Sequence, residues 1–174
     1  METQETNATN VAKDMWWELY YHIRQSGFYH ERREAFFHRW HKLTLFCSII
    51  FGTGAIYALF GPPESSTLAG IGATIVSVTS ALDLVVDTSG QASIHRDLRR
   101  RFADIEVDQL GTRRQLTDDE IREIRGMVRD VEADEPPALP TIVDLAHNDF
   151  VLRAGKREDL KPINIFKRLV GHFG

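Results

Sequence analysis

The side chains best able to do chemistry in this sequence are two histidines and a glutamate that recur every four residues. They are His30, Glu34 and His38, and His41 follows them. Residues four apart share one face of an α-helix, so a helix here would direct imidazole and carboxylate groups toward one metal ion. Aromatic residues surround these positions, and histidine also serves as an amphipathic residue that packs its ring and leaves a polar edge at a surface. We favour that second role and predict no metal site.

Other reactive patterns are missing from the sequence. It has no glycine-rich phosphate loop, no G-x-S-x-G and no H-E-x-x-H. Its one cysteine, Cys47, lies in an uncharged stretch with no base nearby in the sequence, and a single cysteine excludes a disulfide framework. We therefore predict a protein that is not an enzyme and that needs no cofactor.

The charged residues are distributed very unevenly along the chain, and this distribution indicates which kind of helix the sequence forms. Of 21 basic and 25 acidic residues, only Glu64 falls between positions 43 and 82. Residues 43–60 contain 15 apolar or glycine positions out of 18. As a helix they would be roughly 27 Å long, close to the thickness of a bilayer core. A buried hairpin in a soluble helical bundle is the alternative, but a soluble helix usually turns one polar face to water.

The sequence therefore predicts an all-α membrane protein in four parts. These are a polar N-terminal tail at 1–10, an aromatic and basic helical lead-in at 11–42, a transmembrane hairpin at 43–86 and a cytoplasmic helical region at 87–174. The hairpin consists of spans at about 43–60 and 66–86, joined by a short loop.

Basic residues flank this hairpin on both sides, whereas the loop has no lysine or arginine. They are Arg32, Arg33, Arg39 and Lys42 before it, and Arg96, Arg99, Arg100 and Arg101 after it. The positive-inside rule then predicts a multi-pass protein of the inner membrane with both termini in the cytoplasm. An arginine cluster directly after a membrane helix favours lipid phosphate as its partner, so we expect no nucleic-acid partner.

Each predicted span has one face of small residues and one of large apolar residues. The small residues that we expect at helix contacts are Ala69, Ala73, Ser77 and Ala81, with Ser48 and Ala55 on the first span. A repeat of small residues every four positions lets membrane helices approach closely. One hairpin has too little surface to cover both small faces, so we predict a homo-oligomer whose aliphatic faces, including Ile75 and Val78, contact membrane lipid.

A polar strip marks the inner end of the second span. It consists of Thr79, Ser80, Asp83 and Asp87. In an assembly these side chains would line a water-filled passage or a vestibule that attracts cations. The alternative is that the two acids pair with arginines or cap neighbouring helices.

Helical periodicity continues outside the hairpin. The expected features are a break in the lead-in at Ser26–Gly27, a second helix that runs on to Gly111, a capping box at Thr117 and Glu120, a helix from Thr141 to about Gly155, and an amphipathic helix at 163–173. The last of these carries Lys167, Arg168 and His172 beside an apolar side with Ile163, Phe166, Val170 and Phe173. It either lies on anionic lipid or packs against the bundle.

This order of elements resembles the SLATT domain, the two-transmembrane effector domain associated with SMODS nucleotidyltransferases and SLOG sensors. The resemblance covers about residues 12–160. It is strongest in "HRDLRRRF" and in "EPPALPTIVDLAHNDFVLRAG", which is centred on Asp144, His147 and Asn148. It implies a bacterial membrane effector of conflict or anti-phage systems that forms pores once a separate cytoplasmic sensor or regulator protein responds to infection.

Two functions are consistent with these patterns. The first is a membrane effector that oligomerises and permeabilises the bacterial inner membrane on a signal from a cytoplasmic partner, in antiviral defence. The second is a non-conducting anchor or scaffold whose cytoplasmic helices recruit a partner protein.

Overall fold

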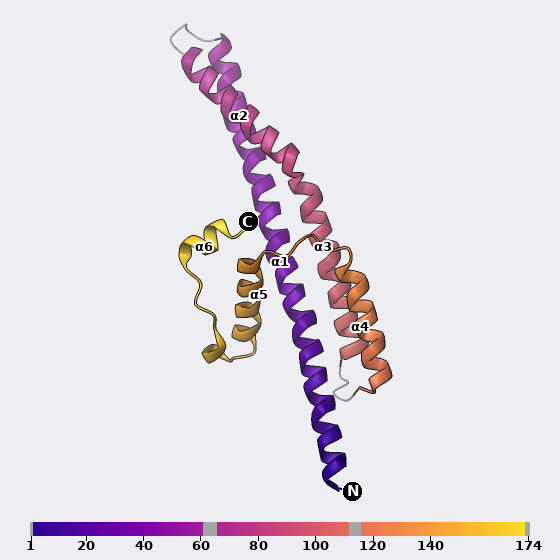
Figure 1. Ribbon diagram of the computed structural model, residues 1–174. Helices are drawn as coiled ribbons and strands as arrows, with labels where there is room; N and C mark the ends of the chain where they lie inside the picture. The colour runs from indigo at the N-terminus through magenta and orange to yellow at the C-terminus, as the bar shows by residue number, and fades with distance from the viewer. Residues whose placement is uncertain (1, 61–65, 112–115, 173–174) are drawn as a thin grey trace. The chain divides into compact units, whose positions relative to one another are not determined.

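The computed structural model describes residues 2–60, 66–111 and 116–172, and every regular element in these ranges is helical (Figure 1). The helices are α1 (Glu2–Phe60), α2 (Ser66–Val86), α3 (Thr88–Ile105), α4 (Asp118–Glu132), α5 (Pro140–Arg153) and α6 (Ile165–Val170). A π-helical turn, η2 (Glu106–Leu110), follows α3, and a 3₁₀ turn, η3 (Arg157–Asp159), follows α5. The prediction of an all-α fold is confirmed. The predicted hairpin loop at 61–65 lies outside the described residues.

Two compact units divide the chain. One comprises residues 1–33 and 95–174, and we call it the helical unit; the other comprises residues 34–94, and we call it the hairpin unit. The long helix α1 and the helix α3 contribute residues to both.

The main core of the helical unit forms where α1, α3 and α4 meet. The buried side chains are Trp16, Leu19 and Ile23 from α1, Leu98, Phe102 and Ile105 from α3, and Ile121, Ile124, Val128 and Val131 from α4. They recur at spacings of three and four, the repeat that places one apolar stripe on each helix. The sequence predicts one apolar face of Ile94, Leu98, Phe102 and Ile105 after the second span. This is confirmed for the last three residues, whereas Ile94 is 43% exposed and does not join the core.

A second core joins α5 to α1 within the same unit. Phe28 and Tyr29 pack against Ile142, Leu145 and Ala146. Tyr29 Oη accepts a hydrogen bond of 3.2 Å from the backbone N–H of Leu139, at the start of α5. At the other end Arg32 donates two hydrogen bonds, of 2.5 and 2.7 Å, to Asp149. A two-pronged arginine–carboxylate contact fixes direction as well as distance, so it sets how α5 lies on α1.

Most of the expected helix ends are present. Thr117 and Glu120 form the complete capping box at the start of α4. Gly111 ends η2 with a φ of 21°, and Gly155 follows α5 with a φ of 74°. The break expected at Ser26–Gly27 is wrong, because α1 runs through both residues. Core residues on either side, Ile23 and Phe28, hold the helix there, and tertiary packing outweighs the roughly 1 kcal/mol helix penalty of one glycine.

The second predicted helix does reach Gly111, but Asp87 interrupts it with a φ of 48°. Asp87 directly precedes α3, and its Oδ1 accepts a hydrogen bond of 3.1 Å from the N–H of Gly90. Asp87 is thus the N-cap of α3, a position that favours aspartate. A Cβ at Gly90 would lie 2.0 Å from Asp87 Oδ2, so a larger residue at position 90 would displace the carboxylate from this position.

The residues of the apolar side predicted for the C-terminal helix do not all lie in the same environment. Ile163 packs against the second core, whereas Phe166 is 69% exposed. Phe173 lies outside the described residues.

Among the described residues, one helical stretch, Ala69–Leu110, is long and apolar enough to cross a membrane by length and composition. Only 6% of its most apolar part is buried, which separates it from the core helix of a soluble protein. The first predicted span includes residues 58 and 59, whose side chains the structure does not describe. Membrane crossing by one helix is therefore supported, and the two-span arrangement stays a prediction.

Candidate functional site

The hairpin unit exposes large apolar side chains on both of its helices. On α1, Ile49 and Ile56 are 66% and 62% exposed, and on α2, Val85 is 82% exposed. The further members of this surface are Leu43, Leu45, Phe46, Ile50, Phe51, Tyr57, Phe60, Ile71, Val78, Leu82, Leu84 and Val86. A soluble monomer rarely exposes so large a contiguous apolar surface, so lipid or another protein must cover it.

The two helices of this unit meet closely at Gly72. This residue is buried, and a Cβ built there would lie 3.3 Å from the backbone oxygen of Phe51. The absence of a side chain therefore permits the backbones to approach, which is the effect that small residues have at contacts between membrane helices. The sequence places Gly72 on the side of the second span that has small residues, although the four-residue repeat used to choose the contact residues omits it.

The predicted helix-packing residues fall into two groups. Ala69, Ser48 and Ala55 are half-buried, whereas Ala73, Ser77 and Ala81 are exposed. At 100° per residue the exposed three lie roughly 100–180° from Gly72. We call them the small-residue arc of α2; they do not take part in the contact made at Gly72. Ile75, predicted to contact lipid, is half-buried, but Val78 on the same arc is exposed.

Asp83 belongs to a polar cluster inside the hairpin unit. His41 Nδ1 lies 3.0 Å from Asp83 Oδ2, and the hydroxyl of Thr88 donates to Asp83 Oδ1. Thr44, which is buried, donates a hydrogen bond of 2.8 Å to the backbone oxygen of His41. An ionisable group within a membrane segment needs such partners, and this arrangement supplies them from α1 and α3.

The other three residues of the predicted strip have local contacts. Asp87 caps α3, and the hydroxyl of Thr79 donates a hydrogen bond of 2.8 Å to the backbone oxygen of Ile75. Ser80 is exposed. Capping, one of the alternatives to the vestibule, describes Asp87, and Asp83 contacts a histidine and a threonine.

The histidines of the opening pattern have separate partners. His41 contacts Asp83, His30 contacts two residues of the helical unit, and His38 is exposed. Within the described part of the chain no group of three or more histidine, cysteine, aspartate or glutamate side chains is arranged to hold a metal ion.

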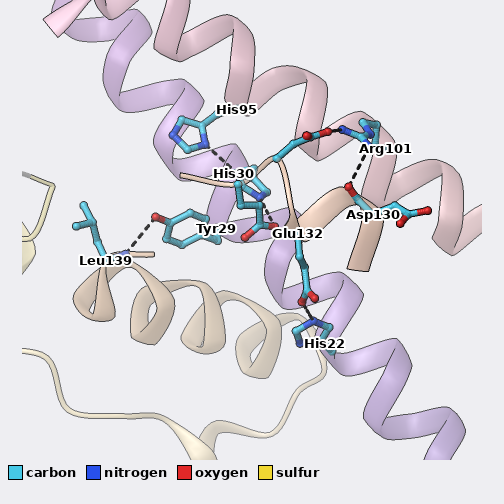
Figure 2. Close-up of polar contacts among 10 residues, drawn as sticks. His22, Tyr29, His30, His95, Arg101, Asp130, Glu132 and Leu139 are labelled. Carbon is cyan, nitrogen blue, oxygen red and sulfur yellow. Dashed lines mark hydrogen bonds and ion pairs between the residues drawn. The ribbon is translucent and has the colours of Figure 1, made fainter. Parts of the chain in front are cut away.

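His30 forms a buried pair with His95 (Figure 2). Their Nδ1 atoms are 2.9 Å apart, and His30 Nε2 lies 3.0 Å from Glu135 Oε1. Both rings are almost completely buried, at 0% and 1% exposure. Burial, with additional repulsion from His30 and Arg33, lowers the pKa of His95 to about 3. Only one hydrogen fits between the two Nδ1 atoms, so the pair is a specific, proton-dependent contact between α1 and α3. No local pattern indicates this pair, because its two residues are 65 positions apart in the sequence.

The arginine cluster is partly engaged with α4. Arg101 donates a hydrogen bond of 2.5 Å to Asp134, and a longer one to the backbone oxygen of Asp130 (Figure 2). Arg96 and Arg100 are exposed, and Arg99 is half-buried. Arg101 therefore connects α3 to the segment that follows α4.

Asp144, His147 and Asn148 bind the segment that follows α5, residues 156–164, which we call the strap. The amide of Asn148 donates a hydrogen bond of 2.9 Å to the backbone oxygen of Lys161 and accepts one of 2.8 Å from its backbone N–H. Asp144 accepts a hydrogen bond of 2.6 Å from Nζ of Lys161. His147 Nε2 donates to the backbone oxygen of Asp159 at 3.0 Å. His147 Nδ1 then accepts a hydrogen bond of 2.6 Å from the hydroxyl of Tyr21. Burial raises the pKa of the Tyr21 hydroxyl, so that hydroxyl keeps the proton that it donates. The three residues hold a chain segment in place.

A cleft of about 700 Å³ also lies between α1 and α5 in the helical unit. The residues that line it include the aromatic Trp17, Tyr21 and Phe150 and the basic Arg24 and Arg153. Arg24 is bonded to Glu106 at 3.1 Å, and Arg153 lies 4.4 Å over the ring of Phe28. These contacts give both cations structural roles.

Comparison of the chain with protein-family models, with characterised proteins and with solved structures finds no match.

Proposed function

We propose that the chain is a membrane protein in which residues 43–60 and 66–86 cross the bilayer as a hairpin. The exposed apolar surface of the hairpin unit is the observation that carries this proposal. The first segment has nine leucine, isoleucine and phenylalanine residues, which contribute about −3 to −5 kcal/mol to insertion. In the second, the contacts of Asp83 with His41 and Thr88 reduce the cost of a carboxylate near the membrane. The flanking arginines favour cytoplasmic termini and a bacterial inner-membrane location.

The hairpin assembles through the small-residue arc of α2. Since the contact at Gly72 does not use this arc, Ala73, Ser77 and Ala81 are available for a second copy of the chain. Small residues at such a face permit close backbone contact, which is the main source of helix association in lipid. A homo-oligomer would cover a surface that one hairpin leaves open.

As an effector, this oligomer permeabilises the inner membrane when a separate cytoplasmic protein signals to the helical unit. The resemblance to SLATT domains supports this role and its place in anti-phage defence. The competing role is a non-conducting anchor. It is favoured by one observation, namely that Asp83 and Asp87 are both engaged inside the hairpin unit, which weakens their assignment to a cation vestibule.

Membrane potential after induced expression in bacteria separates the two roles. For an effector we expect rapid depolarisation that is lost in Ala73→Leu/Ser77→Leu, because leucines on the arc push the helices apart. Val78→Leu is the matched control, since Val78 is exposed on the aliphatic side of α2. Unchanged potential in cells with a membrane-inserted, oligomeric wild type would instead favour the anchor. Equal loss of the oligomer in both variants would show that the arc is not the interface.

A further inference from the structure

The last helix, α6, presents apolar and basic side chains that stay exposed within the described part of the chain. Ile165 and Phe166 are 76% and 69% exposed, and Lys167 and Arg168, which follow them, are exposed as well. Large apolar side chains beside lysine and arginine are typical of segments that lie in the interface of an anionic membrane.

The ends of this segment are fixed. Asn164 caps α6 by accepting a hydrogen bond of 3.2 Å from the N–H of Phe166. At the other end Gly171 is buried, and a Cβ there would lie 2.6 Å from Thr141 Cγ2. Arg33 donates a hydrogen bond of 2.8 Å to the backbone oxygen of His172. The exposed pair therefore lies on an anchored segment, whose outward position is held by specific contacts.

The strap holds the approach to α6. Asn148 pairs with both backbone groups of Lys161, and Asp144 binds the side chain of the same residue. Ile163 packs into the second core, only two residues before Ile165. These contacts give Asp144 and Asn148 a positioning role, since they determine where the exposed pair begins.

We infer that Ile165 and Phe166 insert into the interface of an anionic membrane, where Lys167 and Arg168 contact lipid phosphate. This inference rests on the proposed membrane hairpin. The net positive charge of this segment favours an anionic membrane as its partner, because residues 156–168 include five lysines and arginines and only two acids. Each cation near an anionic surface contributes about 1 kcal/mol, or roughly fivefold in partitioning. Lipid contact at α6 would hold the helical unit against the membrane surface.

The test uses the full chain, with Cys47→Ala, in lipid nanodiscs. An environment-sensitive NBD fluorophore is attached at Ile165→Cys, which retains Phe166 and both cations. We expect a blue-shifted emission that is several-fold brighter in nanodiscs with phosphatidylserine than in pure phosphatidylcholine. High salt should reduce the difference, because it screens exposed charges.

Charge variants make the test specific. Lys167→Glu/Arg168→Glu should abolish the dependence on phosphatidylserine. Arg122→Glu/Arg125→Glu, an exposed pair on α4 with the same change of charge, should retain it. Asn148→Ala, which frees the strap, should reduce the lipid signal and leave both cations in place.

Two results would overturn the inference. One is an emission at position 165 that stays solvent-like in both lipids. The other is a blue shift of equal size in both lipids, together with cross-linking of two copies of the chain through position 165. That result would mean that a second copy, and not lipid, covers this position. A second label at Tyr57→Cys distinguishes this failure from failure of the hairpin itself. A lipid-buried label at 57 with a solvent-like label at 165 contradicts the α6 inference alone, and solvent-like labels at both positions contradict the hairpin too.

Discussion

Acidification should destabilise the helical unit through one buried histidine, His95. The pKa of His95 is about 3 in the folded protein and ordinarily 6.5, because burial disfavours its charged form. Between these values the unfolded chain binds a proton that the folded chain does not. A depressed histidine pKa therefore lowers stability as the pH falls below 6.5.

The size of the effect follows from the distance of the chosen pH from 6.5. At pH 5 the imidazole of His95 is protonated in the unfolded chain. The free energy of unfolding is therefore roughly 2 kcal/mol lower at pH 5 than at pH 7, since each pH unit below 6.5 contributes about 1.36 kcal/mol. Because pH 5 still lies well above the folded pKa, this figure depends mainly on the unfolded chain. For a protein of this size it corresponds to a fall in Tm of roughly 4–8 °C.

The assay compares thermal unfolding of the wild type and His95→Asn in detergent at pH 7 and pH 5. Asparagine offers an amide near the position of Nδ1 but does not titrate. A Trp40→Phe background leaves Trp16 and Trp17, so tryptophan emission reports the helical unit. His22→Asn is the control, since His22 is an exposed histidine that contacts Glu132. Between pH 7 and pH 5, His22→Asn should lose as much stability as the wild type. His95→Asn should lose about 2 kcal/mol less than the wild type. Equal losses in the wild type and His95→Asn would refute the reasoning.

Three further changes test the local contacts. Gly90→Ala places a Cβ 2.0 Å from Asp87 Oδ2, so it should displace the cap of α3, and the loss of about 1 kcal/mol should cancel the roughly 1 kcal/mol that alanine gains over glycine in a helix; Ser89→Ala, at an exposed position, should keep the cap and lose no stability in unfolding experiments. Thr117→Ala removes the hydroxyl that accepts from the Glu120 N–H, one of the two hydrogen bonds of the capping box, and should cost about 1 kcal/mol, seen as earlier loss of helical circular dichroism on heating. Asp83→Asn weakens the contact with His41 and should loosen the hairpin by about 1 kcal/mol, whereas Asp87→Asn keeps a good cap and should have little effect. Equal thermal stability of the two aspartate variants would argue against this assignment.

The sequence predicted those parts of the fold that depend on neighbouring residues. The capping box at Thr117 and the glycine stops at Gly111 and Gly155 depend on a few adjacent positions, and all three are present. The apolar stripe on α3 follows from its spacing alone. The break expected at Ser26–Gly27 is wrong because it used local propensity where distant core residues decide the outcome.

The contacts that the sequence could not reveal join distant residues. His30 was considered with Glu34 and His38 as a local pattern, but its partners are His95 and Glu135. His95 adjoins the arginine cluster, where nothing indicates a buried ring. Asp83 was assigned to an open strip, whereas its partner His41 comes from α1. Only the pairing of helices, which periodicity does not specify, brings these side chains together.

The central claim is that residues 43–60 and 66–86 both cross the membrane, and cysteine labelling tests it most directly. Single cysteines at Ser65 and at Ser93, each with Cys47→Ala, are exposed to a membrane-impermeant maleimide in intact spheroplasts. The account predicts that the cysteine at 65 is labelled at once and that the cysteine at 93 is labelled only after the membrane is permeabilised. Labelling of both cysteines before permeabilisation, or of both only afterwards, would place them on one side and contradict the hairpin.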